Sequence, residues 1–341
     1  MEYLITGAAG FIGFQLSLKL IKKGFSVLGI DNMNNYYDIK LKESRLNLLK
    51  ELSRKENLDF RFKKVDIANQ NEINKLFKKF NPRKVIHLAA QAGVRYSIKN
   101  PQSYVNSNLV GFNNIIDSCV KNEVVHFIFA SSSSVYGGNA KIPFSEKDNV
   151  DHPISLYAAT KRSNELVAHS YSHLFGLPSS GLRFFTVYGP WGRPDMALFK
   201  FTKAILENDP IEVYNYGDLT RDFTYIDDVT ESIFRIINKI PLLDQNHSDY
   251  RNNPSASWAP FQIINIGNSE PIKLMDYIYA IELELNRKAK INFCEMQKGD
   301  VKITASDTSK LENLINYKPN TSIKNGVHKF VEWYRNYYKI N

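Results

Sequence analysis

The most constraining stretch of this sequence is a glycine-rich turn at residues 7–13, close to the N-terminus. It follows a short apolar segment, residues 2–6, that predicts a strand, and it precedes an amphipathic segment that predicts a helix ending at Gly24. Glycine lets the backbone turn tightly and approach a pyrophosphate, which the N-terminus of the helix attracts. A second apolar segment, residues 25–30, ends at Asp31. We therefore expect a βαβ unit that binds a dinucleotide.

The acid at the end of the second predicted strand favours NAD over NADP. The Asp31 carboxylate can hold a ribose 2′-hydroxyl and would repel a 2′-phosphate. Asp66, at the end of the third predicted strand, is placed to contact the adenine. The strand predicted at residues 84–88 ends in Ala89 and Ala90, which are small enough for a cofactor to lie close. The residues predicted to bind NAD are Gly7, Gly10, Phe11, Ile12, Gly13, Asp31, Asn32, Asp66, Ile67, Leu88, Ala89, Ala90, Asn108, Tyr157 and Lys161.

Strand and helix patterns alternate over roughly the first 190 residues, which predicts an α/β fold with a Rossmann-type, doubly wound parallel sheet. We expect residues 1–189 to form the NAD-binding domain and residues 190–341 to form mainly a smaller, interleaved substrate-binding lobe. Late strands around residues 211–230 and 261–267 are expected to return to the first domain. Residues 241–260 are polar and contain proline, so we expect a mobile loop there.

A serine run, residues 131–134, follows a predicted strand, and a helix predicted at residues 155–175 begins with Tyr157 and Lys161. Residues four apart share a helix face, so the phenol and the ammonium can enter one site. The pKa of a free tyrosine is about 10, and a nearby cation lowers it toward a useful range for a base. Ser132 can hydrogen-bond the same substrate oxygen. These residues are therefore candidates for moving a proton on and off a sugar or alcohol hydroxyl.

The Tyr-x-x-x-Lys spacing alone does not identify a catalytic pair. Tyr36 and Lys40 have the same spacing, and a lysine-rich chain with 19 tyrosines produces such matches by chance. The competing interpretation of any single match is an exposed helical pair. The rest of the chain has to decide between them.

Taken together, these motifs resemble the extended short-chain dehydrogenase/reductase family over essentially the whole chain. The matching residues are 6–13, Asp31, Asp66, 87–90, Ser132, Tyr157, Lys161 and 183–185. Within that family the chain looks most like bacterial UDP-glucuronate 4-epimerases, above all in residues 150–161 and 182–197. The resemblance implies reversible, NAD-dependent 4-epimerisation of UDP-glucuronate to UDP-galacturonate through a 4-keto sugar. It implies that Tyr157 is the base, that Ser132 binds the same oxygen, and that Lys161 lowers the pKa of Tyr157 and holds the nicotinamide ribose.

The serine run separates epimerisation from elimination. The sugar 4,6-dehydratases that the chain resembles carry Thr-Asp-Glu where it has Ser132, Ser133 and Ser134, and the related decarboxylases keep a glutamate there. Without a carboxylate at these positions, plain epimerisation is favoured. The alternatives are an epimerase of a neutral or N-acetylated UDP-hexose and, less favoured, a nucleotide-sugar decarboxylase or dehydratase. A non-catalytic, NAD-dependent sensor on the same fold is a further alternative, disfavoured because Tyr157 and Lys161 are both present.

The carboxylate of a hexuronate needs a partner. Arg193 offers a planar fork that suits bidentate pairing, and its alternative role is a loop arginine tied to backbone carbonyls. Thr186 offers a hydroxyl where galactose-type epimerases usually have asparagine. Ser133 and Ser134 are also predicted to contact the substrate.

The resemblance also assigns the nucleotide end of the substrate. It implies that Arg221 binds the diphosphate, whereas a structural pair with Asp222 or Asp227 is the alternative. It implies that Asp300 binds the nucleotide ribose. A UDP-sugar is therefore the expected substrate, and no metal site is expected.

Composition narrows the class of protein. The net charge of +9 comes largely from lysines spread over predicted helix faces, and no basic stripe interleaved with aromatic residues indicates nucleic-acid binding. No apolar run is long enough to cross a membrane, and no signal peptide is expected. The two cysteines, Cys119 and Cys294, do not form a disulfide framework. We therefore expect a cytoplasmic protein without a nucleic-acid or membrane partner.

The family commonly forms homodimers by pairing a helix that corresponds to residues 103–121 with the helix that carries Tyr157. Apolar residues such as Ile115, Ile116 and Val120 permit such pairing, although they also fit ordinary core packing. A homodimer is therefore the expected assembly.

Overall fold

The computed structural model describes residues 1–244 and 253–340. The chain begins with β1 (Tyr3–Thr6), and its side chains explain why a strand forms there. Tyr3 and Ile5 pack on one side of the sheet and Leu4 packs on the other. Successive side chains of a strand point to opposite faces, so a strand that is covered on both faces must be apolar throughout.

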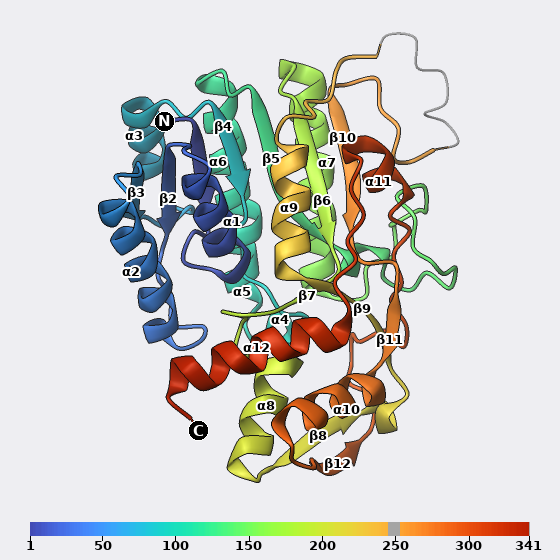
Figure 1. Ribbon diagram of the computed structural model, residues 1–341. Coiled ribbons are helices and arrows are strands. Elements are labelled where there is room, and N and C mark those ends of the chain that lie inside the picture. The colour runs from blue at the N-terminus through green and yellow to red at the C-terminus, as the bar shows by residue number, and fades with distance from the viewer. Residues whose placement is uncertain (245–252, 341) are drawn as a thin grey trace.

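Within the described residues, seven parallel strands form the large sheet, in the order β10-β6-β5-β4-β1-β2-β3 (Figure 1). The remaining strands of this sheet are β2 (Val27–Asp31), β3 (Phe60–Lys64), β4 (Lys84–His87), β5 (His126–Ser132), β6 (Ser179–Phe184) and β10 (Phe261–Ile266). The strand order changes direction between β1 and β4, and a crevice for ligands is expected at the carboxyl ends of the strands there. The predicted doubly wound α/β fold is confirmed.

Helices cover both faces of the large sheet (Figure 1). One face carries α1 (Phe11–Lys22), α2 (Ile39–Lys55), α9 (Ile226–Ile236) and α11 (Ser309–Ile315). The other face carries α3 (Gln70–Phe80), α6 (Gly111–Lys121) and α7 (Leu156–Phe175). Among the helices of the described residues, none combines the length and the apolar character that crossing a membrane requires.

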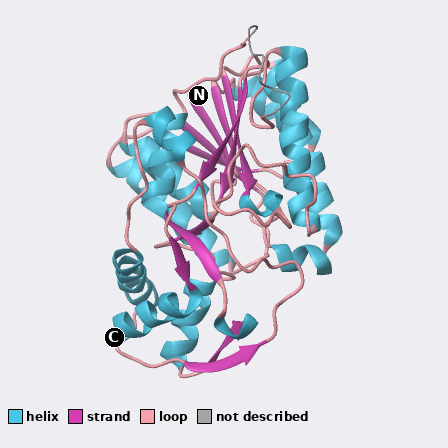
Figure 2. Cartoon of the chain, turned by 90° about the vertical axis from the view of Figure 1, so that its right-hand side faces the viewer, coloured by secondary structure: helices cyan, strands magenta, loops and turns pink. Residues whose placement is uncertain are grey.

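Two smaller sheets lie beyond the carboxyl ends of the large sheet (Figure 2). One contains β7 (Thr186–Tyr188), β9 (Thr220–Tyr225) and β11 (Pro271–Lys273), and the other contains β8 (Pro210–Tyr214) and β12 (Lys290–Cys294). They pack with α8 (Ala197–Glu207), α10 (Leu274–Leu285) and α12 (Ile323–Tyr338) around a separate apolar core. Short helical segments complete the fold at Val94–Lys99 (α4), Ser133–Tyr136 and Asn215–Gly217.

One prediction about the late strands needs correction. Residues 261–266 do join the large sheet as β10, but β8 and β9 do not, and from residues 211–230 only α9 packs on it. The physical reason is that β10 pairs with β6 along its whole length and so fills that edge of the sheet. The division into two domains near residue 189 stays a prediction. The mobility expected for the loop at residues 241–260 falls largely on residues 245–252, outside the described residues.

The helix predicted as continuous over residues 103–121 is interrupted. It consists of α5 (Pro101–Tyr104), a π-helical turn at Val105–Val110, and α6. The side chain of Asn108, within the π-helical turn, is buried and accepts a hydrogen bond from the backbone N–H of Gln91 at 2.8 Å. Such turns are often found where a helix must place a polar group at a functional site.

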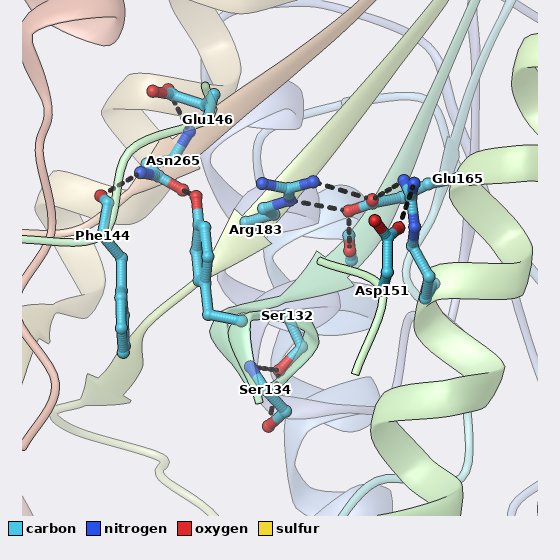
Figure 3. Close-up of polar contacts among 11 residues, drawn as sticks. Ser132, Ser134, Phe144, Glu146, Asp151, Glu165, Arg183 and Asn265 are labelled. Atoms are coloured by element: carbon cyan, nitrogen blue, oxygen red, sulfur yellow. Dashed lines mark hydrogen bonds and ion pairs between the residues drawn. The ribbon is translucent and has the colours of Figure 1, made fainter. Parts of the chain in front are cut away.

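A buried ion pair fixes α7 against the sheet behind the serine run (Figure 3). Arg183 of β6 donates to Glu165 of α7 through Nε and Nη2, at 2.8 and 2.9 Å, and the two side chains are 3% and 1% exposed. Ser131 Oγ donates to the same carboxylate at 2.6 Å. Burial alone would raise the pKa of Glu165, but the charge and hydrogen bonds of Arg183 hold it below its usual value.

Removing one partner of this pair should destabilise the fold strongly, because the other charge stays buried without compensation. We expect Arg183→Met to lower the free energy of unfolding by about 3–5 kcal/mol, measured by urea denaturation. Arg61→Met is a matched control, because Arg61 pairs with Asp59 on an exposed surface. It should change the stability by about 1 kcal/mol or less. Equal losses in the two variants would contradict the role given to Arg183.

Candidate active site

A cavity of about 940 Å³ lies at the carboxyl ends of the large sheet. Its wall includes residues that follow β1, β2, β4, β5 and β6, and residues of β7, α8, β8 and β9 from the smaller lobe. Ligands of open parallel sheets bind at this edge. Most residues predicted for the site line this cavity: Gly7, Gly10, Phe11, Ile12, Gly13, Asp31, Asn32, Ile67, Leu88, Ala89, Ala90, Ser132, Ser133, Ser134, Tyr157, Lys161, Thr186, Arg193, Arg221 and Asp300.

The glycine turn forms a cradle that side chains would fill. Gly7 has a positive φ of 72°, and a Cβ there would lie 2.8 Å from the backbone nitrogen of Ala89. A Cβ on Gly13 would lie 2.1 Å from the carbonyl oxygen of Gly7. Both contacts are closer than real Cβ atoms tolerate, so glycine is required. The backbone can therefore approach a pyrophosphate at the N-terminus of α1, and the turn fits a dinucleotide.

The carboxylate of Asp31 is fixed beside this cradle. Its Oδ2 accepts from the backbone N–H of Ala9 at 3.2 Å, and its Oδ1 accepts from that of Met33 at 2.8 Å. Lys42, which is buried in the same wall, donates to the carbonyl and side-chain oxygens of Asn34 at 2.8 and 2.9 Å. Burial lowers the pKa of Lys42, although the charge of Asp31 opposes this effect. This end of the cavity suits a ribose with free hydroxyls.

Two predicted cofactor residues do not line the cavity. Asp66 is exposed, and its carboxylate accepts from the Nδ2 of Asn32 at 3.1 Å. Asn108 is buried, and its Nδ2 donates to the carbonyl of Gln91 and to Oγ1 of Thr160. The amide of Asn108 is therefore used inside the protein, and its role in cofactor binding stays a prediction.

Strand β5 and helix α7 bring the three predicted catalytic residues to the cavity. Ser132 ends β5, and its Oγ accepts from the backbone N–H of Ser134 at 3.2 Å (Figure 3). Tyr157 lies in the first turn of α7. Lys161 is one turn further along and 4% exposed, and its Nζ donates to the carbonyl oxygen of Ala130 at 2.8 Å. The helix thus holds the phenol and the ammonium in one site.

The electrostatics of Tyr157 differ in part from the prediction. Burial raises the pKa of the phenol, while the nearby Ser132 hydroxyl and the positive charge of Arg193 lower it, and burial outweighs both. Burial also lowers the pKa of Lys161, to about 8. The Nζ of Lys161 is held by a strand carbonyl in this structure, and the lowering of the Tyr157 pKa by Lys161 stays a prediction.

The structure places one carboxylate close to the serine run, but not in the cavity wall. Glu165 accepts from Ser131 Oγ and is paired with Arg183. Its pKa is held below the usual value, so it stays ionised and cannot act as an acid. Among the described residues, the carboxylates that do line the cavity are Asp31, Asp195, Glu212 and Asp300.

Arg193 lies in the wall between the serine run and the smaller lobe, but its fork is already partly used. Its Nε donates to Oδ1 of Asp195 at 3.0 Å, and its Nη2 bonds to Oδ2 of the same carboxylate. The alternative of an arginine tied to backbone carbonyls is not what the structure shows. Thr186 lines the same cavity from β7.

Arg221 and Asp300 lie together at the other end of the cavity. Arg221 Nη1 donates to the carbonyl oxygens of Thr220 and Lys302, both at 2.9 Å. Asp222, a possible partner in a structural pair, instead accepts from the backbone N–H of Asn268 and neighbouring groups. Arg221 is therefore not held by Asp222.

Several residues of the cavity wall have no recognised motif in the sequence. Arg95 donates to Asp300 Oδ2 at 2.9 Å and lies over the ring of Tyr214. Tyr36 comes from the polar segment after Asp31, and its spacing to Lys40 gave no indication of a site. A useful signal for both would have been position, because each follows the carboxyl end of a strand in the large sheet.

Comparisons with known proteins agree with this arrangement. A model of the family described as GDP-mannose 4,6 dehydratase matches residues 4–330. Protein CapI of Staphylococcus aureus is 52% identical over 99% of this chain and 100% of its own length. A probable UDP-glucuronate 4-epimerase of Rhizobium meliloti is 45% identical over 99% of this chain and 98% of its own length.

A solved structure extends the comparison to three dimensions. The UDP-glucuronic acid 4-epimerase of Bacillus cereus, in complex with UDP-glucuronic acid and NAD, superposes with a TM-score of 0.86 at 34% identity. The match covers 99% of this chain and 100% of that structure. The chain therefore belongs to the GDP-mannose 4,6 dehydratase family, within the extended short-chain dehydrogenases/reductases.

Proposed function

We propose that this protein is an NAD-dependent isomerase that interconverts UDP-glucuronate and UDP-galacturonate by epimerisation at C4. The observation that carries the proposal is one cavity that contains the glycine cradle, the Ser132/Tyr157/Lys161 group and Arg193. The Rhizobium meliloti relative and the Bacillus cereus structure support this reaction and this cofactor.

In this reaction, each reacting group of the chain handles one proton or one oxygen. Tyr157, as the phenolate, removes the proton from the sugar 4-hydroxyl, and Ser132 hydrogen-bonds the same oxygen. The glycine turn and Asp31 would hold NAD, which would supply the hydride acceptor and donor for C4. A general base of this kind contributes roughly 10²–10⁴-fold to the rate. The hydrogen bond from Lys161 to the carbonyl of Ala130 ties helix α7, which carries Tyr157, to strand β5.

The available carboxylates favour epimerisation over elimination. Elimination across C5–C6 needs an acid and a base beside the sugar, and residues 132–134 supply only hydroxyls. Asp195 is the cavity carboxylate tied to Arg193, whereas Asp31 is bound by backbone amides at the cofactor end. Neither of these two carboxylates is a free acid at the serine run. The chemistry that remains is oxidation and re-reduction at C4.

The substrate is a uronate because the cavity offers a cation and hydroxyls near Tyr157. We infer that Arg193 and Thr186, with Ser133 and Ser134, bind the sugar carboxylate. Asp195 bonds to Nε and Nη2 and so does not use the end edge of the guanidinium, formed by Nη1 and the second Nη2 proton. A carboxylate can pair with two parallel N–H groups at that edge.

Arg221 and Asp300 are proposed to bind the diphosphate and the nucleotide ribose. Arg221 keeps Nε and Nη2 for a ligand, because only its Nη1 is bonded within the described residues. Asp300 is held by Arg95, so this end of the cavity combines two guanidinium groups with one carboxylate. That charge balance suits a diphosphate next to a ribose hydroxyl.

We also infer a homodimer built on α6 and α7. These helices lie side by side, and α7 exposes Leu166 and Leu174, which are 54% and 68% exposed and lie two i,i+4 steps apart. Val110, at the start of α6, adds a further exposed apolar side chain. A second copy could bury this stripe.

The purified protein should convert UDP-glucuronate into UDP-galacturonate without net formation of NADH, because the cofactor is regenerated in each cycle. Product analysis by NMR on a panel of UDP-sugars measures this. Tyr157→Phe is the control and should lower kcat by roughly 10²–10⁴-fold. Conversion of UDP-glucose or UDP-N-acetylglucosamine alone would contradict the uronate assignment, and release of CO₂ or water would contradict epimerisation.

Activity should depend on pH through Tyr157 and Lys161. Because burial raises the pKa of Tyr157, its phenolate fraction is small at neutral pH, and kcat/KM should rise with pH. Burial lowers the pKa of Lys161 to about 8, so this lysine is charged below that pH and loses its charge above it. Because a nearby cation favours the phenolate of Tyr157, loss of this charge should make the rise in kcat/KM level off or reverse near pH 8. If Lys161→Met retained the same break in a rate profile, Lys161 would not be its source.

Arg193→Lys should lower the activity on the uronate more than the activity on a neutral sugar, because lysine keeps the charge but loses the bidentate fork. We expect kcat/KM for UDP-glucuronate to fall by about 10- to 100-fold, and that for UDP-glucose to fall much less. Arg221→Lys is the control. It should lower kcat/KM for both substrates alike, because both carry the diphosphate that Arg221 is proposed to bind. Equal losses for the two sugars in Arg193→Lys would count against the assignment.

A further inference from the structure

Asp195 holds one edge of the guanidinium of Arg193 and leaves the other edge open. The carboxylate bonds to Nε and Nη2, which form the side edge of the planar group. Asp195 does not use the end edge, formed by Nη1 and the second Nη2 proton, and the guanidinium also lies close to Tyr36. Both side chains are partly buried, at 23% and 27% exposed, and both line the cavity. The open edge is therefore available to a ligand.

Tyr36 anchors this carboxylate from the cofactor side of the cavity. Its hydroxyl donates to Asp195 Oδ2 at 3.1 Å, and its ring lies 4.7 Å from the ring of Tyr96. The hydroxyl also approaches Gly93, where a Cβ would lie 2.8 Å from it. Glycine at position 93 thus leaves the space that the Tyr36 hydroxyl needs. Two segments far apart in the sequence therefore meet at one carboxylate.

The protonation states suit a fixed arrangement. Burial, followed by the charge of Asp195, raises the pKa of Tyr36 to about 12, so the phenol keeps its proton and remains a donor. Burial alone would raise the pKa of Asp195, but the charge and bonds of Arg193 hold it below its usual value. Arg193 is close enough to Tyr157 for its charge to lower the pKa of that phenol. The guanidinium of Arg193 is thus near the reacting group.

We propose that Asp195 is a positioning residue that orients Arg193 for the substrate carboxylate, with Tyr36 as its second anchor. The inference rests on the proposed function, because it assigns the carboxylate of a uronate to the open edge of the fork. A guanidinium on a loop can rotate about its side-chain bonds, and a bidentate ion pair on one edge removes that freedom. The fork is then presented in a fixed direction before the substrate arrives.

A competing possibility is that Asp195 occupies the place of the substrate carboxylate and is displaced on binding. The geometry opposes it, because the two edges of the guanidinium are distinct and Asp195 uses only one. The two ideas predict opposite effects. If Asp195 orients the arginine, its removal weakens uronate binding, and if Asp195 competes, its removal strengthens it.

The test compares Asp195→Ala with the wild type on UDP-glucuronate and UDP-glucose. We expect kcat/KM and the association constant from calorimetry to fall at least about 10-fold more for the uronate than for the neutral sugar. Tyr36→Phe, which removes one hydroxyl, should shift the same ratio in the same direction by about 2- to 3-fold. Because Tyr36 acts through Asp195, the double variant should discriminate no worse than Asp195→Ala alone.

Asp300→Ala is the matched control, because it also removes an aspartate that pairs with an arginine, in this case Arg95 at the other end of the cavity. This variant should lower kcat/KM and the association constant for both sugars by similar factors. Tighter uronate binding in Asp195→Ala, or equal losses for both sugars, overturns the proposal. An unstable Asp195→Ala protein leaves the decision to Tyr36→Phe. Calorimetry also separates the role of Asp195 from the proposed function. If Asp195→Ala weakens the binding of UDP-glucuronate selectively, but the wild-type protein does not epimerise this sugar, only the proposed function is refuted.

Discussion

The site depends on how helix α7 is fixed against strand β5. The carbonyl of Ala130 accepts from Lys161, and the hydroxyl of Ser131 donates to Glu165, one helical turn further on. These contacts use two consecutive residues of the strand and leave Ser132, the next one, at the cavity beside Tyr157. The buried Arg183 completes the arrangement, because it holds Glu165 from the neighbouring strand. The relative position of the reacting groups is thus set behind the cavity, in the core.

A second constraint joins the glycine turn to the loop after β7. Arg45 of α2 is fully buried, and its Nη1 donates to the carbonyl of Ala9 at 2.8 Å. Its Nη2 donates to the carbonyl of Trp191 at 2.6 Å. One side chain therefore ties the predicted cofactor turn to the segment that carries Arg193. Because a guanidinium has five donors in a rigid fork, it can satisfy several buried carbonyls at once.

Two arginines of the cavity wall are paired with carboxylates. Asp195 balances Arg193, and Asp300 balances Arg95, so neither arginine is a buried charge without compensation. Burial of isolated charges is costly, and pairing lowers that cost while leaving part of each fork free for a ligand. Burial raises the pKa of Tyr157 in this structure, and the charge of Arg193 and the hydroxyl of Ser132 offset only part of that effect. Each of these two pairs gives the cavity directional donors without adding net charge.

The sequence by itself determined the fold class and most of the cavity wall. The turn at residues 7–13, Asp31, the serine run and the Tyr157/Lys161 spacing are local patterns, and strand ends of a parallel sheet converge in a predictable place. It could not determine pairings between distant segments. The placement of β8 and β9, the satisfied amide of Asn108 and the contact of Tyr36 with Asp195 all depend on tertiary packing. Tyr36 and Asp195 are 159 residues apart, and no local pattern encodes a hydrogen bond across that separation.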